Sequence, residues 1–379
     1  METPNKPQTF DEFKKRREMK KPDLPKVVND ESILALCGEY MFDNWGICYV
    51  NFREYDFSNC SLEAMSKICF SSSTKWPNTD KLPKGFNPQE ILKQATTTNE
   101  GVKNLHNQGI NGEGITVAVL DSGFQGQNHI EFENAELIRC TLDDEETLEY
   151  HFHMEDVLAK LCGKNLGIAP KVKVLYYECS TADDNSESIN KALKDILRRI
   201  EQGENIRIVN HSGPFSMGDE PLKYEKENFE MVKILRSKNC EVIYSDIFGQ
   251  NFFCCGTTFL NKDNNINQYQ PASFLNAKFK EETKNCINIL CSGRTIPEFC
   301  TTDGYKYEVV DCFSWTIPQG CGYYALCLQV NPNLTFKQFT EACQISCDIS
   351  SSGLHVLNAE RLIKCVKEQI NTEECVKNL

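Results

Sequence analysis

Short apolar runs alternate with helical patterns through the middle of the chain. Four continuous apolar runs have the length of buried strands, and three stretches between them repeat their apolar positions with a helical period. The runs cover residues 115–120, 172–177, 206–209 and 242–244, and the helical stretches cover residues 154–161, 186–200 and 224–235. Such alternation predicts an α/β domain of three layers, α/β/α, in which helices cover both faces of a mainly parallel sheet.

The segments before residue 85 have a different pattern. Residues 1–26 are charged, contain prolines and show no apolar period, so we expect a mobile tail there. Residues 27–84 contain two short apolar stretches and a helical pattern over residues 62–69. They predict a small N-terminal α+β unit that ends in a linker, residues 74–86. The alternating pattern then places the larger domain at residues 85–379.

Composition argues against several classes of protein. The chain has 379 residues, of which 40% are hydrophobic and 25% are charged, as is typical of globular proteins. Its net charge of −13 argues against nucleic acid as a partner, because phosphate binding requires concentrated Lys and Arg. No window approaches the roughly 18 continuous apolar residues of a membrane-spanning helix. We therefore expect neither a nucleic acid nor a membrane as partner.

The twenty cysteines indicate disulfides if the protein is secreted and thiols if it is cytosolic. The charged N-terminus contains no apolar segment of the kind found in signal peptides. We therefore expect a cytoplasmic protein whose cysteines are mostly reduced and buried. The pairs Cys254 with Cys255 and Cys343 with Cys347 lack the spacing of a zinc knuckle, so no metal site is expected.

The first apolar run ends in a candidate catalytic acid. Residues 115–120 lead directly into Asp121-Ser122-Gly123, which places a carboxylate at the carboxyl end of a buried strand. Active sites of parallel sheets lie at such strand ends. An Asp before Ser-Gly is also an ordinary turn signal. The assignment of Asp121 therefore depends on what accompanies it elsewhere in the chain.

A histidine at the start of a helical stretch is a candidate base. His153 opens the stretch His153-Met-Glu-Asp-Val-Leu-Ala-Lys-Leu-Cys-Gly163. The turn Gly167-Ile-Ala-Pro170 and the second apolar run follow it directly.

A serine before a second helical stretch is a candidate nucleophile. Ser314 lies in Cys312-Phe-Ser-Trp-Thr-Ile-Pro318. An apolar helix is predicted at residues 322–330, and the turn Asn331-Pro-Asn-Leu-Thr335 comes after it.

These segments resemble the motifs of the subtilisin-like serine proteases. The Asp121 segment is similar to that family's Val-Ala-Val-Leu-Asp-Ser/Thr-Gly, and the His153 segment keeps the histidine and the closing glycine of its His-Gly-Thr-His-Val-Ala-Gly. The Ser314 segment shares only serine and proline with Gly-Thr-Ser-Met-Ala-x-Pro, but the downstream turn lies at the expected distance. Residues 352–360 are similar to the family's closing segment, so the resemblance covers about residues 101–367.

The resemblance implies a catalytic triad in which Asp121 orients His153 and His153 activates Ser314. A serine hydroxyl is a poor nucleophile until a histidine takes its proton, and a buried aspartate holds the imidazole in the required tautomer. The backbone N–H of Ser314, at a helix start, is expected to face the oxyanion that develops on the attacked carbonyl.

Two parts of the expected site depart from the family's pattern. The family's second oxyanion donor is an asparagine in an Ala-Ala-Gly-Asn-x-Gly segment, for which this chain offers Asn251 as the first candidate and Asp246 as the second. The substrate-binding edge, Ser-Leu-Gly-Gly in the family, is replaced by Ser212-Gly213-Pro214. Proline removes a backbone donor, so we expect altered pairing with the substrate backbone.

Two neighbouring residues are expected to have structural roles. His211 precedes the substrate-binding edge and is expected to be a surface or loop histidine, not a ligand. Trp315 follows Ser314 and is expected to pack against its surroundings, not to recognise a substrate.

The sequence therefore predicts a serine endopeptidase that hydrolyses a restricted set of peptide or protein substrates through an acyl-enzyme on Ser314. No cofactor or metal is expected. The competing hypothesis is a catalytically silent subtilisin-like protein with a binding or regulatory role, which the altered oxyanion and substrate-binding segments favour. The N-terminal unit is expected to be either a propeptide or a retained docking domain for a regulatory partner.

Overall fold

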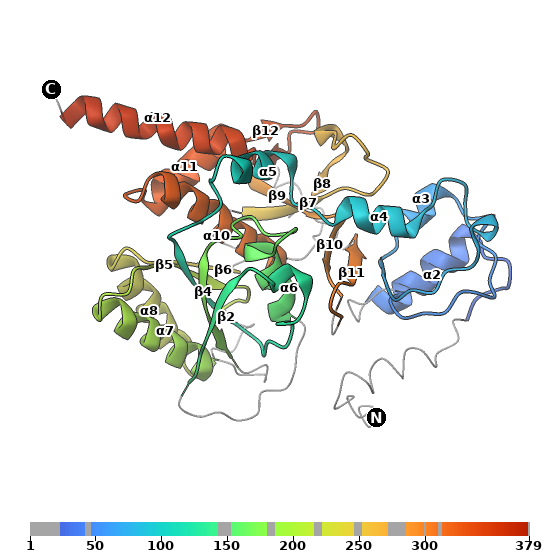
Figure 1. Ribbon diagram of the computed structural model, residues 1–379, viewed down its shortest axis with the longest axis horizontal. Coiled ribbons are helices and arrows are strands. Elements are labelled where there is room, and N and C mark those ends of the chain that lie inside the picture. Colours follow the sequence, from blue (N-terminus) through green and yellow to red (C-terminus); the bar gives the residue numbers. More distant parts are fainter. Residues whose placement is uncertain are drawn as a thin grey trace.

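The computed structural model of the chain is shown in Figure 1. It describes residues 23–41, 47–142, 153–179, 186–215, 222–245, 252–271, 286–298, 301–309 and 313–377. The tail expected at residues 1–26 lies outside the described residues as far as residue 22. Both oxyanion candidates, Asp246 and Asn251, also lie outside them.

A five-stranded sheet forms the centre of the larger domain. Its strand order is β3-β4-β2-β5-β6, and every neighbouring pair is parallel. The strands are β2 (Thr116–Asp121), β3 (Glu136–Cys140), β4 (Lys173–Glu178), β5 (Ile206–His211) and β6 (Glu241–Tyr244). Four of the five, all except β3, were predicted from the apolar runs, because a strand that is covered on both faces is apolar throughout.

Helices cover both faces of this sheet, as predicted. They are α6 (His153–Cys162) and α10 (Phe313–Val330) on one face, and α7 (Ser186–Glu201) and α8 (Glu225–Ser237) on the other. Successive side chains of a strand point to opposite faces. Val117 and Val119 of β2 accordingly pack with α6 and α10, whereas Ala118 and Leu120 pack with α7 and α8. The three-layer α/β/α architecture is therefore confirmed.

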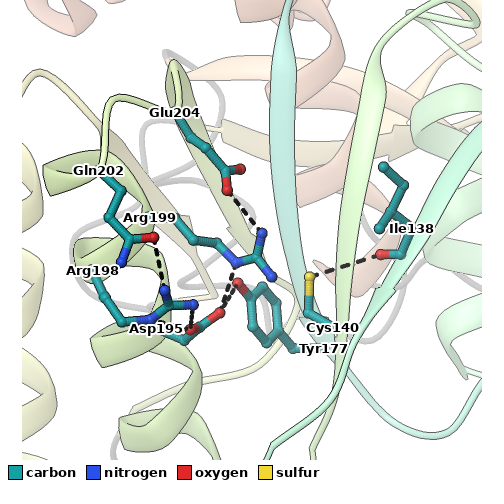
Figure 2. Close-up of polar contacts among 8 residues, drawn as sticks. All are labelled: Ile138, Cys140, Tyr177, Asp195, Arg198, Arg199, Gln202 and Glu204. Carbon is teal, nitrogen blue, oxygen red and sulfur yellow. Dashed lines mark hydrogen bonds and ion pairs between the residues drawn. The ribbon is translucent and has the colours of Figure 1, made fainter.

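A polar network ties α7 to strand β4 of the sheet, as Figure 2 shows. The Tyr177 hydroxyl donates to Asp195 Oδ2 at 2.8 Å, and Arg199 Nε donates to the same oxygen at 2.8 Å. Arg199 also donates to Glu204 at 3.0 Å, beyond the end of the helix. Because these bonds join β4 to α7 and to the turn after it, they fix the rotation of α7 on the sheet.

A second sheet lies beside α10. Its order is β12-β13-β9-β7-β8, and α10 packs against β7 and β9 of this sheet as well as against β5 of the first. Its strands are β7 (Phe252–Gly256), β8 (Gln270–Pro271), β9 (Ile287–Ser292), β12 (Asp348–Ile349) and β13 (His355–Val356). The remaining helices of the larger domain are α4 (Pro88–Ala95), α5 (Glu100–Asn107), α11 (Phe336–Ser346) and α12 (Ala359–Lys377), with short turns η2 (Ile130–Phe132) and η3 (Ile266–Gln268).

The apolar core of the N-terminal unit also includes residues of the larger domain. Its elements are α2 (Asp30–Met41), α3 (Leu62–Met65), β1 (Phe70–Ser71) and η1 (Thr79–Lys81). Strand β1 pairs with β11 (Tyr305–Glu308), which continues to β10 (Arg294–Pro297). Tyr307 of β11 and Ile91 of α4 belong to the same apolar cluster as the N-terminal residues.

The stretch expected as a linker is part of this shared core. Leu82 and Phe86 are buried in it, and the ring of Trp76 stacks on Phe52 with a centroid distance of 5.5 Å. The expected boundary at residues 84 and 85 therefore falls inside a packed cluster. The helix expected over residues 62–69 is also shorter and ends at Met65.

Among the cysteines whose side chains the structure describes, fourteen are buried. Burial raises the pKa of the Cys162 thiol to about 12, which keeps it protonated and unreactive. Within the described part of the chain, no helix is long and apolar enough to cross a membrane.

Candidate active site

The carboxyl ends of two neighbouring strands bring the first candidate residues together. β2 and β5 are adjacent and parallel, so both end at the same edge of the sheet. Asp121 is the last residue of β2, and Ser212 directly follows β5. This edge is where active sites of open α/β sheets lie.

Asp121 forms a close pair with His153, the first residue of α6. The imidazole Nδ1 lies 2.8 Å from Asp121 Oδ1 and 3.0 Å from Oδ2. The carboxylate also accepts the backbone N–H of Ser122 at 2.7 Å and its hydroxyl at 3.2 Å. Because a carboxylate can only accept, Nδ1 must carry a hydrogen, which leaves Nε2 as the basic nitrogen of the neutral ring.

The two partners shift each other's pKa in opposite directions. Burial lowers the pKa of His153, but the charge of Asp121 and the hydrogen bond to it outweigh burial and raise that pKa above its ordinary value. Burial likewise raises the pKa of Asp121, but the charge of His153 and the hydrogen bonds to the carboxylate lower it overall.

These shifts define where the pair stabilises the fold. The contribution of a histidine with a raised pKa is complete below its unfolded pKa and is lost as pH rises through the folded value. The contribution of an aspartate with a lowered pKa is present above its unfolded pKa and is lost as pH falls through the folded value. The pair therefore contributes its full stabilisation at pH values between the unfolded pKa of Asp121 and the unfolded pKa of His153.

Local contacts hold α6 and α10 in place around this pair. The hydroxyl of Ser122 accepts the backbone N–H of Met154 at 3.3 Å, which anchors the first turn of α6 to the end of β2. The closing glycine of the motif, Gly163, has no room for a side chain, because a Cβ there would overlap the Ala159 carbonyl at 2.6 Å. A Cβ on Gly322 would lie 2.6 Å from Ile168, so this glycine lets α10 approach the turn after α6.

Ser314 lies in the first turn of α10, facing the end of β5. Its hydroxyl donates to the backbone carbonyl of Ser212 at 3.2 Å. Pro318, inside the same helix, has no N–H to donate to the Ser314 carbonyl. The side chain after Ser314, Trp315, places its ring centroid 5.3 Å from that of His153. Asp121, His153 and the start of α10 thus meet at one edge of the sheet.

Trp315 belongs to a buried polar network that sequence reasoning missed. Its Nε1 donates to Glu308 Oε2 at 2.8 Å, and Lys306 Nζ donates to Glu308 Oε1 at 3.0 Å. All three side chains are buried. The only signal in the sequence is the spacing of Lys306 and Glu308, two residues apart on one face of a strand, which is also common at exposed edges. The packing role expected for Trp315 is consistent with this network.

Solved structures with a similar fold identify the architecture. The chain matches the prenylagaramide maturation protease PagA with a TM-score of 0.50 and 17% identity, over 71% of this chain and 99% of that one. It matches the structure of the PatG macrocyclase in complex with peptide with a TM-score of 0.50 and 16% identity, over 70% of this chain and 96% of that one. It also matches the subtilase cytotoxin SubAB with a TM-score of 0.50 and 15% identity, over 74% of this chain and 97% of that one. The chain has a subtilisin-like fold. No family model matches the sequence, and no curated protein matches it.

The edge that the sequence predicts to bind substrate is partly closed. Ser212 is buried, Gly213 is half-buried and Pro214 is exposed. The carbonyl of Gly213 accepts the backbone N–H of Ser245 at 3.2 Å, so it continues the pairing of β5 with the chain after β6. Among these residues, Pro214 is the one fully open to solvent, and it carries no backbone donor.

His211 is buried at the end of β5, so the expectation of a surface or loop histidine is wrong. Its side chain is buried, and Nδ1 donates to the Leu120 carbonyl at 3.4 Å. Its other nitrogen, Nε2, is buried and has no hydrogen-bond partner among the residues that the structure describes. Burial lowers the pKa of His211, which favours the neutral ring. The histidine is buried because β5, two residues longer than its apolar run, ends at this position.

The remaining expectations concern ligands and the oxyanion donor. β6 ends at Tyr244 and β7 begins at Phe252, so Asp246 and Asn251 belong to the connection between these strands, outside the described residues. Both stay predictions. Across the described residues, no group of three or more His, Cys, Asp or Glu side chains is arranged to hold a metal ion.

Proposed function

We propose that the chain is a serine endopeptidase that hydrolyses a restricted set of peptide or protein substrates through an acyl-enzyme on Ser314. The observation that carries the proposal is the hydrogen-bonded pair of buried Asp121 and half-buried His153 at the carboxyl end of β2, next to the turn of α10 that bears Ser314. A subtilisin-like fold alone does not establish an activity, because function depends on the site.

The chemistry of acylation follows from the tautomer of His153. As Ser314 Oγ attacks the scissile carbonyl carbon, its proton passes to His153 Nε2, and the Asp121 carboxylate stabilises the resulting imidazolium. The imidazolium then gives this proton to the leaving amine as the C–N bond breaks, which leaves the acyl group on Ser314. Water, deprotonated by the same nitrogen, hydrolyses the ester and restores the serine hydroxyl.

Two features of the site must change or be completed during this reaction. The Ser314 hydroxyl, which donates to Ser212 in the resting site, has to rotate about its Cα–Cβ bond toward His153. Apo active sites often have such looser arrangements before a substrate binds. The oxyanion would be stabilised by the backbone N–H of Ser314, in the first turn of α10, and by a donor from Asn251 or Asp246.

The second candidate function is a catalytically silent binding protein with the same fold. The hydrogen bond from Ser314 to Ser212 favours it, because in that position the hydroxyl is committed to a carbonyl. The partly closed edge at Gly213 and Pro214 favours it as well.

Labelling with a fluorophosphonate separates the two functions. The hydroxyl of an activated serine attacks the phosphorus of the probe and fluoride leaves, so wild type should be labelled covalently and Ser314→Ala should not, with unchanged thermal stability. A control variant, Ser352→Ala, removes an exposed hydroxyl and should label like wild type. Equal labelling of wild type and Ser314→Ala, or no labelling of wild type, would reject the protease and favour the silent protein.

The shared core supports a retained N-terminal unit in preference to a removed propeptide. Its loss would expose Tyr307 and leave β11 without its partner β1. We infer that this unit stays attached and offers a docking surface to a regulatory partner, and that the protein acts in the cytoplasm with its cysteines reduced.

A further inference from the structure

A cavity of about 200 Å³ lies between the C-terminal end of α6 and the N-terminal ends of α5 and α12. Figure 1 shows α5 beside α12. None of Asp121, His153 and Ser314 lines it. An apolar cavity of about 150 Å³ is large enough for a benzene molecule, so a small organic ligand fits here. Part of the wall is apolar and includes Leu166, Ile168, Ile289, Leu290 and Leu357.

Two cationic side chains line the cavity without a carboxylate partner. Lys160 is 4% exposed, and its Nζ donates to the Thr295 carbonyl at 2.8 Å. Arg294 is half-buried, and its Nη2 donates to Asn264 Oδ1 at 3.3 Å. Neither forms an ion pair with any residue that the structure describes. Since burial of unpaired charge is costly, a negative group in the cavity would relieve that cost for both.

Three hydroxyl groups on the same wall also lack partners. The Oγ1 atom of Thr98 is buried and has no hydrogen bond. Tyr323 is 3% exposed and Tyr269 is 7% exposed, and neither hydroxyl bonds to a residue in the described part of the chain. Buried polar groups are paired in the large majority of cases. Thr98 is an exception among the described residues, and the two tyrosines line the same cavity, so their three hydroxyl groups could donate to a ligand that accepts hydrogen bonds.

The acidic residues near the cavity do not neutralise these cations. Asp348 accepts Arg361 at 2.6 Å and Asn358 at 2.7 Å, so its charge is already balanced. Glu360 is exposed and accepts the Asn104 amide at 3.3 Å.

Two carboxyl groups face Lys160 from behind the wall. Glu308 is bonded to Lys306 and Trp315, and burial raises the pKa of Asp156 well above its ordinary value, which favours its neutral form. The wall thus has two positive charges, on Lys160 and Arg294, and one negative charge that is not balanced elsewhere, on Glu360. The net charge of the described wall is +1.

We propose that this cavity binds a small organic monoanion, with its carboxylate between Arg294 and Lys160 and its apolar part against Ile168 and Leu357. A neutral molecule would leave the cations unpaired, and a fully polar anion would leave the apolar wall without contacts. The proposal goes beyond the protease activity and does not depend on it. Lys160 lies two helical turns, about 10 Å, along α6 from His153, so a ligand there also contacts the helix that carries the candidate base.

Binding of benzoate to the Ser314→Ala protein tests the proposal without interference from self-cleavage. Calorimetry and thermal unfolding are measured with benzoate, with inorganic phosphate and with neutral benzyl alcohol. Benzoate should bind and raise the melting temperature as its concentration rises, and the other two should bind at least about tenfold more weakly, because each lacks the apolar part or the charge. Tighter binding of phosphate or benzyl alcohol than of benzoate overturns the proposal, and so does an absence of benzoate binding.

Variants locate the site. Arg294→Gln should weaken benzoate binding about tenfold or more, because it removes a charged hydrogen-bond donor. Arg198→Gln, on α7 and absent from the cavity wall, should not change it. Tyr323→Phe removes only a hydroxyl that has no hydrogen-bond partner among the described residues, so it should fold normally and weaken binding about threefold to tenfold. If Arg294→Gln fails to fold, Tyr323→Phe decides, and unchanged affinity in that variant shows that benzoate binds elsewhere.

Discussion

Helix α6 carries a basic side chain at each end, and the two ends are stabilised in different ways. His153, at the N-terminal end, is paired with the buried carboxylate of Asp121, which raises its pKa despite burial. Lys160, in the last turn, is buried against the Thr295 carbonyl, and burial lowers its pKa. His153, paired with a carboxylate, is therefore suited to exchanging protons, whereas Lys160, a buried cation without a carboxylate partner among the described residues, is suited to binding an anion.

The largest expected effect is at the His153 end. Asp121→Asn should lower kcat by about 10⁴-fold, because the amide can also donate a hydrogen bond and favours the wrong tautomer. In wild type, kcat/KM should rise with pH through a midpoint above the ordinary histidine pKa of about 6.5, and the substitution should move that midpoint down, since the charge that raises it is lost. Rate against pH for both proteins is the measurement.

A second buried carboxyl on the same helix provides the control. Asp156→Asn leaves Asp121 in place, so the midpoint of its pH profile should match that of wild type. If Asp121→Asn and Asp156→Asn have the same midpoint, the pairing of Asp121 with His153 does not set the pKa of the base.

The next effect concerns the oxyanion donor, which decides whether the His153 end is a complete catalytic site. Asn251→Ala should lower kcat by about 100- to 1,000-fold with little change in KM, because the donor's hydrogen bond is strong only in the transition state. If Asp246 is the donor instead, its carboxyl must be protonated while His153 is neutral. The profile of wild type would then be a narrow bell, and Asp246→Asn would broaden it. Unaltered rates and profiles in both variants would place the donor outside this segment.

A smaller effect is expected where the Trp315 network supports His153. Trp315→Phe keeps an aromatic ring beside the imidazole but removes the N–H that Glu308 accepts, so unfolding should become easier by about 1 to 3 kcal/mol. Trp76→Phe is a matched control, because Trp76 Nε1 is buried without a partner and the same volume is lost. Denaturant unfolding of both variants compares them, and an equal loss of stability would mean that the bond to Glu308 contributes nothing.

The smallest effect is expected at the Lys160 end. Met is similar in length to Lys, so Lys160→Met should change the free energy of unfolding by less than about 1.5 kcal/mol at neutral pH. The sign of its pH dependence opposes that of His153. The pKa of Lys160 is lowered in the folded protein. Wild type should therefore gain stability relative to the variant as pH rises toward the pKa of lysine in the unfolded chain, near 10.4. Unfolding of both proteins between pH 7 and pH 10 measures this, and a difference that stays constant contradicts a lowered pKa.

Local sequence was enough to predict the parallel sheet and to bring Asp121 and His153 to one edge of it. An apolar run that ends in Asp-Ser-Gly determines a strand end, and all carboxyl ends of a parallel sheet share one edge. The alternation of apolar runs and helical stretches therefore predicted which strand ends meet in the fold. The order of the motifs indicated the subtilisin-like fold. Helix ends followed the pattern closely at α6, where His153 begins the helix as expected. Whether Asn251 or Asp246 completes the site stays a prediction.

Tertiary structure alone decided which charged and polar residues are buried. Lys160, Glu308 and His211 have nothing in their sequence surroundings that separates them from solvated residues, because the same spacing suits an exposed face. Their burial results from contacts between segments far apart in the chain, such as β11 with Trp315 and α6 with Thr295. For the same reason the stretch expected as a linker at residues 74–86 is packed. Its aromatic residues belong to the same apolar cluster as Tyr307, more than two hundred residues away, and only the assembled fold brings these segments together.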